Sequence, residues 1–484
     1  MNWRETLNRM GLWLALAVGA PAAVAGDWFE RFKQEATDEA LHRFLYAMPK
    51  GGDLHLHLTG SAFPEWLHEI ALAEAAQGVA YYVKTRIDNC AVDVSQADAY
   101  LMLHRTLDQR RYEALSECER GEYQALGALD AEARAAWMNS VRLEAPHEGR
   151  DEFFERHWQR LGDLLRNPHV VAEMLYRNMR AFADEGVAYI EPQVPVFGFL
   201  DRAGAPLAPE GVLAVYRQRM AQADAQATGV TVRMQLSALR FHPQAEQTLR
   251  RIYRLASEHA DVVAVNLVGR EDHDRGHPLR FLDTFRDLRR THPGVRLSIH
   301  AGESARPDSH VRDTLLLGAD RIGHGLNLIQ DARTLLDFRH GPHLVEINLI
   351  SNLLLGYVDG FDAHPFPEYL RIGVPVALST DDRGMWDSTL TDEFFVAVRE
   401  YNLTWAELRA LGRNSLAFSF LDEATKSRLL ADYERRMDRF AADFKRRGTA
   451  SLDQVQPLRR GFVCRHYGLC EGEDSKESTP HGNG

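Results

Sequence analysis

Two histidines two residues apart, His55 and His57, stand in an otherwise apolar, strand-like run at residues 52–58. Side chains at positions i and i+2 of an extended strand leave the same face, so both imidazoles point the same way. Two neutral imidazoles on one face are suited to bind a divalent metal, and zinc is the commonest choice. Taken alone, the pair fits equally well with two histidines that only cap or pack a strand end.

Three further groups of polar residues stand at the ends of predicted strands far downstream. They are His300-Ala301-Gly302-Glu303, Gly323-His324-Gly325 and Ser379-Thr380-Asp381-Asp382. Each has a plain structural explanation alone, since an Asp pair often caps a helix, Gly-His-Gly often forms a turn, and the helix dipole favours a first-turn Glu. The occurrence of all three at strand ends, in one chain with the His-x-His pair, favours a shared site.

Together these groups predict a catalytic metal site. The ligands would be His55, His57, His300 and Asp381. They supply three imidazole nitrogens and one carboxylate, and leave one position on the metal open for water. Zinc lowers the pKa of bound water to about 7, which makes hydroxide available at neutral pH. The remaining polar residues are then available to take the water's proton, to protonate a substrate and to orient it: Glu303, His324 and Asp382.

Strands that alternate with helices are the elements that must bring these residues together. After Gly186, seven apolar runs predict strands: 187–194, 230–236, 262–268, 295–300, 321–324, 344–349 and 374–379. With the first strand, which carries His55 and His57, they make eight. Eight strands joined by right-handed crossovers predict an α/β fold, the (β/α)8 TIM barrel, whose strand C-termini surround one mouth. A doubly wound sheet also alternates, but no Gly-x-Gly-x-x-Gly follows an early strand.

The segments around these strands predict one domain with additions. Helical patterns cover three stretches: 27–48, 63–76 and 152–184. No strong strand is predicted between residues 61 and 187, and the polar, charged stretch at about 80–145 is interpreted as an insertion after strand 1, over the rim of the barrel. We expect a single barrel domain over residues 26–470, with extra N-terminal helices, and a disordered polar tail over 471–484.

Composition limits the classes of partner. With 484 residues, of which 45% are hydrophobic and 26% charged, the chain is long and apolar enough to bury a large core. The formal net charge of −12 argues against nucleic acid as a partner, because binding a phosphate backbone needs a basic surface.

The N-terminus has the pattern of a secretory signal peptide. Arg4 and Arg9 precede an apolar run at residues 11–20, and Ala23-Val24-Ala25 is a small-x-small cleavage site. Cleavage after Ala25 predicts a secreted or periplasmic protein. No stable membrane insertion is expected after cleavage, since the apolar run is short for a membrane span. An uncleaved anchor is the alternative.

Four cysteines fit an oxidising compartment. The economical pairing is local, Cys90 with Cys118 and Cys464 with Cys470, and it is one of three connectivities that four cysteines allow. The H-x-E plus P-C-x-x-C signature of the cytidine-type zinc deaminases does not occur in the sequence.

The metal and proton-transfer motifs, in this order and spacing, resemble the adenosine deaminases of the metal-dependent amidohydrolase superfamily over residues 48–387. Other features resemble the extracellular branch, the adenosine-deaminase-related growth factors. They are the signal peptide, Met48-Pro49-Lys50-Gly51, and Leu267-Val268-Gly269-Arg270-Glu271-Asp272. Ser351-Asn352 and His364-Pro365 also stand where the family usually has them.

The resemblance implies one zinc ion per subunit and a purine nucleoside as the small-molecule substrate. It implies that Glu303 protonates N1 of the purine, His324 stabilises and deprotonates the attacking water, and Asp382 hydrogen-bonds N7. The backbone N–H of Gly269 would meet N3, because glycine permits close approach of the base. Hydroxide then adds to C6 of the purine and ammonia leaves. Adenosine would yield inosine, and 2′-deoxyadenosine would yield 2′-deoxyinosine.

Three residues are candidates for contact with the rest of the nucleoside. Thr59 replaces the acidic residue that adenosine deaminases commonly use for the ribose 5′-hydroxyl, and it offers a neutral hydroxyl instead of a carboxylate. Glu191 and Trp386 are pocket-lining candidates, with core packing an equal alternative for both.

Two other functions stay open. One is deamination of another 6-aminopurine nucleoside, 5′-modified or N6-substituted, and the other is a secreted binding protein with a non-catalytic barrel. The presence of every expected ligand and proton-transfer residue favours the enzyme. The resemblance to the extracellular branch also suggests a homodimer to which residues 27–48 contribute.

Overall fold

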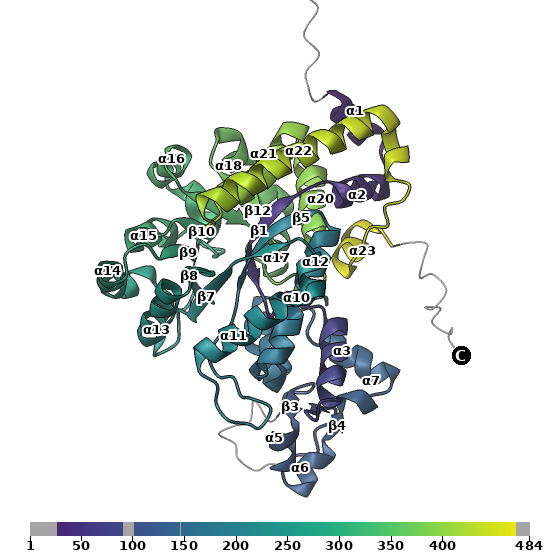
Figure 1. Ribbon diagram of the computed structural model, residues 1–484, viewed down its shortest axis with the longest axis vertical. Helices are drawn as coiled ribbons and strands as arrows, with labels where there is room; N and C mark the ends of the chain where they lie inside the picture. Colours follow the sequence, from purple (N-terminus) through teal and green to yellow (C-terminus); the bar gives the residue numbers. More distant parts are fainter. Residues whose placement is uncertain (1–26, 91–100, 146, 471–484) are drawn as a thin grey trace, which may run out of the picture.

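Eight parallel strands form a barrel, seen from the side in Figure 1, in the computed structural model, which describes residues 27–90, 101–145 and 147–470. In order around the barrel, the strands are β1 (Gly51–His57), β5 (Val187–Gln193), β7 (Met234–Leu239), β8 (Val262–Val268), β9 (Arg296–Ala301), β10 (Arg321–His324), β11 (Leu344–Ile347) and β12 (Val376–Leu378). A two-residue strand, β6 (Thr231–Val232), also pairs with β5. The predicted (β/α)8 barrel is confirmed, and the predicted signal peptide and tail lie outside the described residues.

The last strand segment meets the first beside the His-x-His pair. The His57 N–H donates to the Asp381 carbonyl at 3.0 Å, and the Asp381 N–H donates to the His55 carbonyl at 2.9 Å. A parallel bridge joins Leu56 to Asp381 between them. Residues more than 300 positions apart in sequence thereby become backbone neighbours at the mouth of the barrel.

Inward-facing polar side chains fill part of the barrel below this mouth. On β5 the side chains of Tyr189, Glu191 and Gln193 share one face because a strand repeats every two residues. Arg321 on β10 pairs with Glu191 and with Glu346, which lies on β11. The ion pairs keep these buried charges compensated, so the barrel interior supports the strand ends rigidly.

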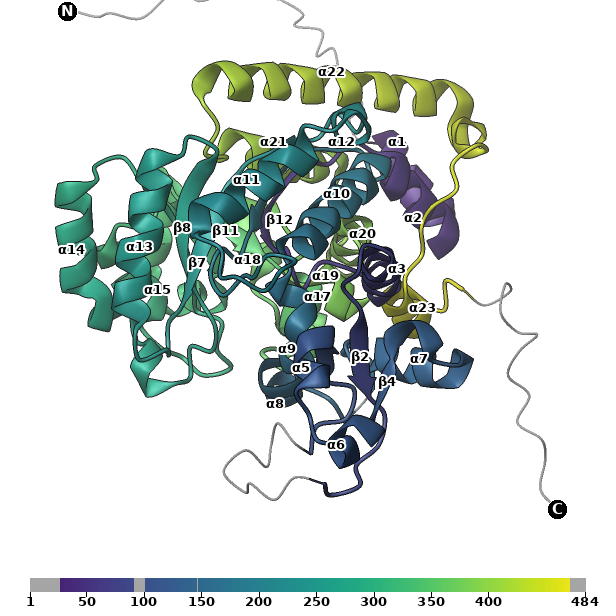
Figure 2. The ribbon, with the colours of Figure 1, turned by 60° about the horizontal axis from the view of Figure 1, so that its bottom comes forward.

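Helices pack around the barrel and across one of its ends. They include α3 (Pro64–Ala75), α10 (Pro168–Asp184), α11 (Pro209–Met220), α13 (Ala245–Glu258), α14 (Leu282–Thr291), α15 (His310–Leu317), α16 (Ala332–His340), α20 (Leu390–Tyr401), α21 (Trp405–Ala417) and α22 (Glu423–Arg447). Figure 2 shows α22 across one end of the molecule and the insertion at the opposite end. No described helix is long and apolar enough to cross a membrane.

The helical stretch expected over residues 27–48 is confirmed, and it consists of two helices. They are α1 (Asp27–Glu35) and α2 (Asp38–Ala47), and the Thr37 hydroxyl accepts the Ala40 N–H at 3.2 Å to begin the second. Phe32 of α1 then packs against Phe444 of α22 with ring centroids 4.8 Å apart. The local cap ends the helical run that the apolar stripe alone had suggested.

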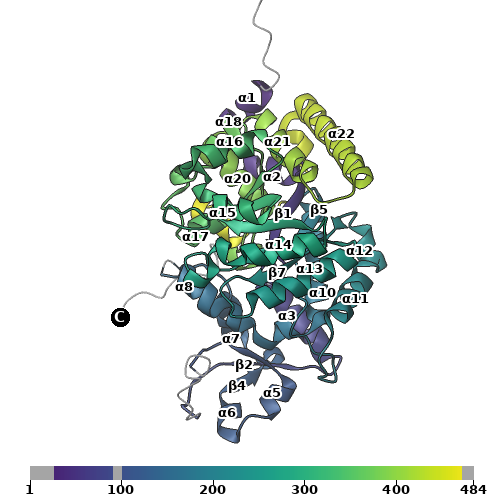
Figure 3. The same ribbon diagram turned by 90° about the vertical axis from the view of Figure 1, so that its left-hand side faces the viewer.

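The insertion after β1 contains a small antiparallel sheet, so the prediction of no strand there is wrong. Its strands are β2 (Tyr81–Lys84), β3 (Thr106–Asp108) and β4 (Tyr123–Ala125), in the order β3-β2-β4. Strands of three or four residues are too short to show a clear alternation of apolar and polar residues. Figure 3 shows this unit projecting below the barrel. The predicted disulfides, Cys90–Cys118 and Cys464–Cys470, are both confirmed.

The helical run expected over residues 152–184 is interrupted before α10. A π-helical turn, η3 (Phe153–His157), follows α8 (Arg150–Glu152), and α9 (Trp158–Leu161) and the 3-10 turn η4 (Gly162–Arg166) come next. Gly162 has a φ of 49°, a left-handed conformation that ends α9. These turns direct aromatic side chains toward the mouth of the barrel, as described below.

Candidate active site

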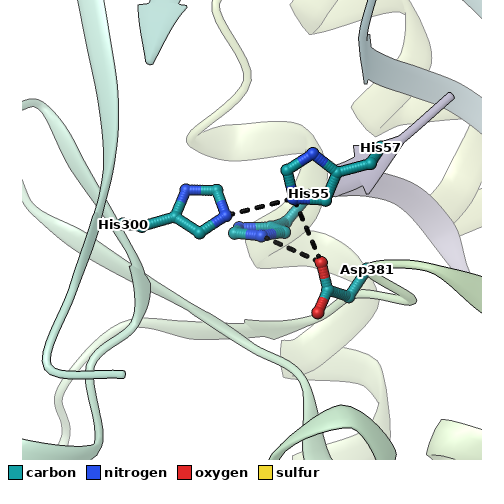
Figure 4. A group of neighbouring side chains, drawn as sticks. All are labelled: His55, His57, His300 and Asp381. Carbon is teal, nitrogen blue, oxygen red and sulfur yellow. Dashed lines mark hydrogen bonds and ion pairs between the residues drawn. The ribbon is translucent and has the colours of Figure 1, made fainter. Parts of the chain in front are cut away.

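The four predicted metal ligands come together at the C-terminal ends of the strands (Figure 4). The His57 Nε2 atom lies 3.2 Å from His300 Nε2 and 3.3 Å from Asp381 Oδ1, and His55 Nε2 lies 3.6 Å from the same oxygen. Donor atoms bound to one tetrahedral zinc at about 2.0–2.2 Å are separated by about 3.3–3.6 Å, so the spacing is close to that of a shared ion.

The neighbours of two ligands determine which nitrogen faces the cluster. His55 Nδ1–H donates to Glu346 Oε2 at 2.8 Å, and His300 Nδ1–H donates to Asn266 Oδ1 at 3.0 Å. Each neutral ring then carries its lone pair on Nε2. His55 Nε2 is buried and has no hydrogen-bond partner among the described residues. A buried lone pair with no donor fits a metal ligand, so these residues suit a divalent ion.

Glycines next to the ligands leave space for the side chains of the site. A Cβ on Gly323 would lie 2.5 Å from His55 Cε1, and a Cβ on Gly60 would lie 1.7 Å from Asp382 Oδ1. His324 and Asp381 adopt left-handed backbone conformations, with φ values of 63° and 53°. Non-glycine residues in this region are strained, and such strain clusters at functional sites.

The three predicted proton-transfer residues border the same cluster. Glu303 Oε1 lies 3.8 Å from His324 Nε2, and Asp382 Oδ1 is buried without a hydrogen-bond partner in the described part of the chain. Burial, with the negative charge of Asp381 nearby, raises the pKa of both carboxyl groups well above their ordinary values. A carboxyl group that keeps its proton is able to donate to a purine nitrogen.

Glu271 supports the loop that carries Glu303. Its carboxylate accepts the backbone N–H groups of Gly302 at 2.9 Å and Glu303 at 3.1 Å, and the His310 Nδ1–H at 2.8 Å. Burial alone would raise the pKa of Glu271, but the Arg240 charge and the His310 hydrogen bond outweigh it and lower the pKa to about 2. Glu271 therefore holds the Glu303 backbone as an anion.

A chain of hydrogen bonds reaches His324 from the outer side. The Phe366 N–H donates to His364 Nδ1 at 3.1 Å, so a neutral His364 carries its proton on Nε2. That proton is donated to Asn352 Oδ1 at 3.1 Å, and Asn352 Nδ2 donates to His324 Nδ1 at 3.0 Å. Burial is the main cause that lowers the pKa of His324 to about 3. Neutral His324 therefore presents an Nε2–H to the site.

A cavity of about 370 Å³ opens over these groups. Its lining includes three of the four predicted metal ligands, the three proton-transfer residues, and neutral polar, aliphatic and aromatic side chains: His57, Thr59, Phe153, Phe154, Trp158, Gln193, Pro195, Ser237, Leu239, Phe241, Val268, Gly269, His300, Glu303, His324, Asp381 and Asp382. The volume suits a small molecule, since ligand pockets typically measure about 300–1,000 Å³.

Two of the four candidates for substrate contact line this cavity and two do not. Thr59 and Gly269 are in its lining. Glu191 lies inside the barrel, where it pairs with Arg321, and Trp386 is fully buried and packs on Phe153 with ring centroids 4.7 Å apart. Glu191 and Trp386 are therefore buried packing residues, which is the alternative that the sequence had left open for both.

Comparison with known proteins decides the family. Residues 120–435, well over half of the chain, match the family described as adenosine deaminase. The chain belongs to the adenosine deaminase family. It is also 30% identical over 272 residues to an adenosine deaminase of Serratia proteamaculans, covering 56% of this chain and 77% of that protein. Like the proteins it matches, it is a hydrolytic deaminase.

Other members that resemble this deaminase differ in the substrate that their names give. An adenine deaminase of Chelativorans sp. is 31% identical over 232 residues, covering 48% of this chain and 69% of that protein. A solved structure of an Arabidopsis N6-mAMP deaminase has a TM-score of 0.58 at 20% identity, covering 81% of this chain and 99% of that one. The names include a free base, a nucleoside and a nucleotide.

Several residues that support the deaminase site were not singled out from the sequence. Glu346 and Asn266 are single polar residues in otherwise apolar strands, and that isolation is the signal that marks them. Gln193 shares its strand with Glu191, two residues earlier, and the sequence gives it no such signal. Phe153 begins a π-helical turn and Trp158 directly follows it, and the sequence has no clear signal for such a turn.

Proposed function

We propose that this deaminase converts adenosine and 2′-deoxyadenosine into inosine and 2′-deoxyinosine, with release of ammonia and with one zinc ion per subunit. The observation that carries the proposal is the cluster of His55, His57, His300 and Asp381, which lies beside Glu303, His324 and Asp382 at one nucleoside-sized cavity. Three neutral nitrogens and a carboxylate are the donor types that catalytic zinc prefers.

The chain's own residues then act at named atoms of the purine. Zinc, when bound by the four ligands, lowers the pKa of water so that hydroxide is available at neutral pH. Glu303 gives its proton to N1, which makes C6 more electrophilic. The Asp382 carboxyl group, whose Oδ1 has no hydrogen-bond partner among the described residues, meets N7, and the N–H of Gly269 meets N3. These contacts orient C6 toward the metal cluster.

His324 acts in this proposal as a donor to the attacking oxygen. Its Nε2 atom lies 3.8 Å from Glu303 Oε1, and the Asn352 amide donates to the opposite nitrogen, Nδ1. An N–H in this position stabilises the negative charge that develops when oxygen adds to C6. This differs from the proton-acceptor part of the role that the family resemblance implies for His324.

The test compares 6-aminopurine nucleosides on zinc-loaded protein, with products separated by chromatography. Stoichiometric inosine and ammonia from adenosine would support the proposal. Efficient deamination of N6-methyladenosine with little action on adenosine would instead favour the N6-substituted alternative. Binding of nucleosides with no turnover would favour a non-catalytic binding protein.

Two further proposals come from the sequence. Residues 1–25, which lie outside the described residues, would direct export and be removed after Ala25, and N-terminal sequencing of the exported protein tests this. The homodimer through residues 27–48 predicts a two-chain species in sedimentation at micromolar concentration. A single-chain species there would contradict it.

A further inference from the structure

Gln193 is a buried amide without a partner. Its side chain lines the active-site cavity and is 3% exposed, and neither Oε1 nor Nε2 has a hydrogen-bond partner among the described residues. Leaving a buried donor and acceptor unpaired destabilises a protein, and such groups are few in folded proteins. A group of this kind at a cavity wall is explained when a ligand completes its hydrogen bonds.

The neighbouring inward residue on the same strand shows that β5 normally satisfies such groups. Glu191, two residues earlier, accepts hydrogen bonds from Tyr189, Gln235, Arg321 and the Phe420 backbone. Gln193 is one layer nearer the mouth, and its Cα pairs with that of His57 in the strand register. The unpaired amide is thus at the level of the metal cluster, within the substrate cavity.

The position of Gln193 around the barrel corresponds to the sugar end of the substrate. In the strand order, β5 stands opposite β10, the strand that carries His324. The proposed orientation places purine N1 and C6 near Glu303 and His324, so the glycosidic bond points across the mouth toward β5. Thr59 after β1 and Ser237 on β7 flank Gln193 on that side of the cavity lining.

The cavity lining on the sugar side is uncharged. Neutral polar groups of Thr59, Gln193 and Ser237 stand among aromatic and aliphatic side chains, and the described residues that line the cavity include no lysine or arginine. Leu239 lines the cavity and is still 48% exposed, which places it at the mouth. The nearby Arg270 is already paired with Asp151 and Asp272. A phosphate would enter this side without a cation to bind it.

We infer that Gln193 binds the vicinal 2′- and 3′-hydroxyl groups of the ribose, and that the deaminase selects nucleosides with an uncharged 5′ end. An amide offers one acceptor and two donor hydrogens, and each hydroxyl is both donor and acceptor, so the pair is complementary. The inference rests on the proposed function and adds the residue and the sugar chemistry that determine its substrate.

The test combines a variant with a matching change in the substrate. Adenosine, 2′,3′-dideoxyadenosine and AMP are compared on zinc-loaded wild type, Gln193→Met and the control Gln77→Met, which changes an exposed glutamine. Wild type should prefer adenosine to the dideoxy compound in kcat/KM by about tenfold or more, and should reject AMP more strongly. Gln193→Met should lose the preference for hydroxyls, while Gln77→Met keeps it.

The melting temperature distinguishes a binding role from a structural one. Methionine removes two unpaired polar atoms, so the free Gln193→Met protein should melt no lower than wild type. A lower melting temperature, or a variant that keeps the wild-type ratio between the two nucleosides, would overturn the inference. Efficient turnover of AMP by the wild type would overturn the inference that the enzyme selects nucleosides with an uncharged 5′ end.

Calorimetric binding of inosine and 2′,3′-dideoxyinosine separates this inference from the proposed function. If no 6-aminopurine is deaminated, the proposed function fails. Inosine affinity that falls about tenfold in Gln193→Met, with dideoxyinosine affinity unchanged, would still support the ribose contact. Equal affinities for wild type and variant would overturn it.

Discussion

His364 fixes the tautomer of His324 through the side-chain amide of Asn352. The Phe366 N–H occupies His364 Nδ1, so His364 Nε2–H must donate to Asn352 Oδ1, and the amide N–H is left for His324 Nδ1. Through Asn352, a backbone group outside the cavity therefore favours the tautomer of neutral His324 in which the pocket-facing nitrogen carries the hydrogen. Outer partners of this kind tune the groups that contact a substrate.

Asn352→Asp tests this relay with almost no change in size. An aspartate accepts from His324 Nδ1–H, so the lone pair of neutral His324 moves to Nε2 and the N–H toward the attacking oxygen is lost. We expect kcat to fall by about 10- to 100-fold with the zinc content unchanged. Nitrogen-15 NMR of the histidines would report the tautomer, and an unchanged kcat with a changed tautomer would contradict the assigned role.

Glu303→Gln tests the proton donation to N1. The amide keeps the shape of the side chain but carries no acidic proton, so kcat should fall by about 10²-fold or more. None of the four predicted ligands is altered, so bound zinc should stay at the wild-type level. Glu368→Gln, a change at an exposed glutamate, is the control. Wild-type turnover by Glu303→Gln would remove Glu303 from the mechanism.

Gly60→Ala tests whether Asp382 must stand where it does. The added Cβ would lie 1.7 Å from Asp382 Oδ1 and 2.6 Å from its Cγ, so the carboxyl group has to move. A displacement of about 1 Å at a reacting group can cost about 10²-fold in rate. The control is Gly211→Ala, where the nearest atom to the added Cβ is 3.9 Å away. Equal kcat for both variants would show that Asp382 tolerates displacement.

The Glu271–His310 pair predicts a pH-dependent part of stability. The pKa of Glu271 is lowered to about 2 in the folded protein. Its contribution to the free energy of unfolding is therefore fully present above its pKa of 4.5 in the unfolded chain, and is lost as pH falls toward 2. Burial alone would lower the pKa of His310, but its hydrogen bond to Glu271 outweighs burial and raises it. The contribution of His310 to the free energy of unfolding is therefore fully present below its pKa of 6.5 in the unfolded chain, and is lost as pH rises through the raised pKa of the folded protein. Arg240 and Asp308 also face the pair.

His310→Gln removes the charge of this pair and keeps an N–H donor. Urea unfolding over a pH series should show wild type more stable by about 1–2 kcal/mol between about pH 4.5 and 6.5, with a smaller difference at higher and lower pH. His340→Gln, at an exposed position, should show no such window. A difference independent of pH would mean that packing, not charge, explains the effect.

The barrel and its metal cluster were predictable because their signals are local. His-x-His, His-Ala-Gly-Glu and Asp-Asp each end a strand, and parallel strands bring their ends to one mouth. The small sheet of the insertion was not predictable, since strands such as β3 (Thr106–Asp108) are too short to show a period. The orientation of Gln193 depends on which face of β5 turns inward, and that is decided by the pairing of whole strands.

The supporting residues illustrate a second limit. Glu346 and Asn266 are buried in strands by packing from every side, and their hydrogen bonds to His55 and His300 link strands that are distant in sequence. A polar residue in an apolar strand signals a buried partner but does not identify it. Only the closed barrel identifies which histidine each one orients.

Zinc titration of the chelator-treated protein, followed by the loss of adenosine ultraviolet absorbance, tests the central claim most directly. Activity should be absent without metal and should rise linearly to a plateau at one zinc per chain. The melting temperature should rise over the same range, because an ion that binds the folded state stabilises it. Full activity in the metal-free protein, or no activity at saturating zinc, would contradict a metal-dependent adenosine deaminase.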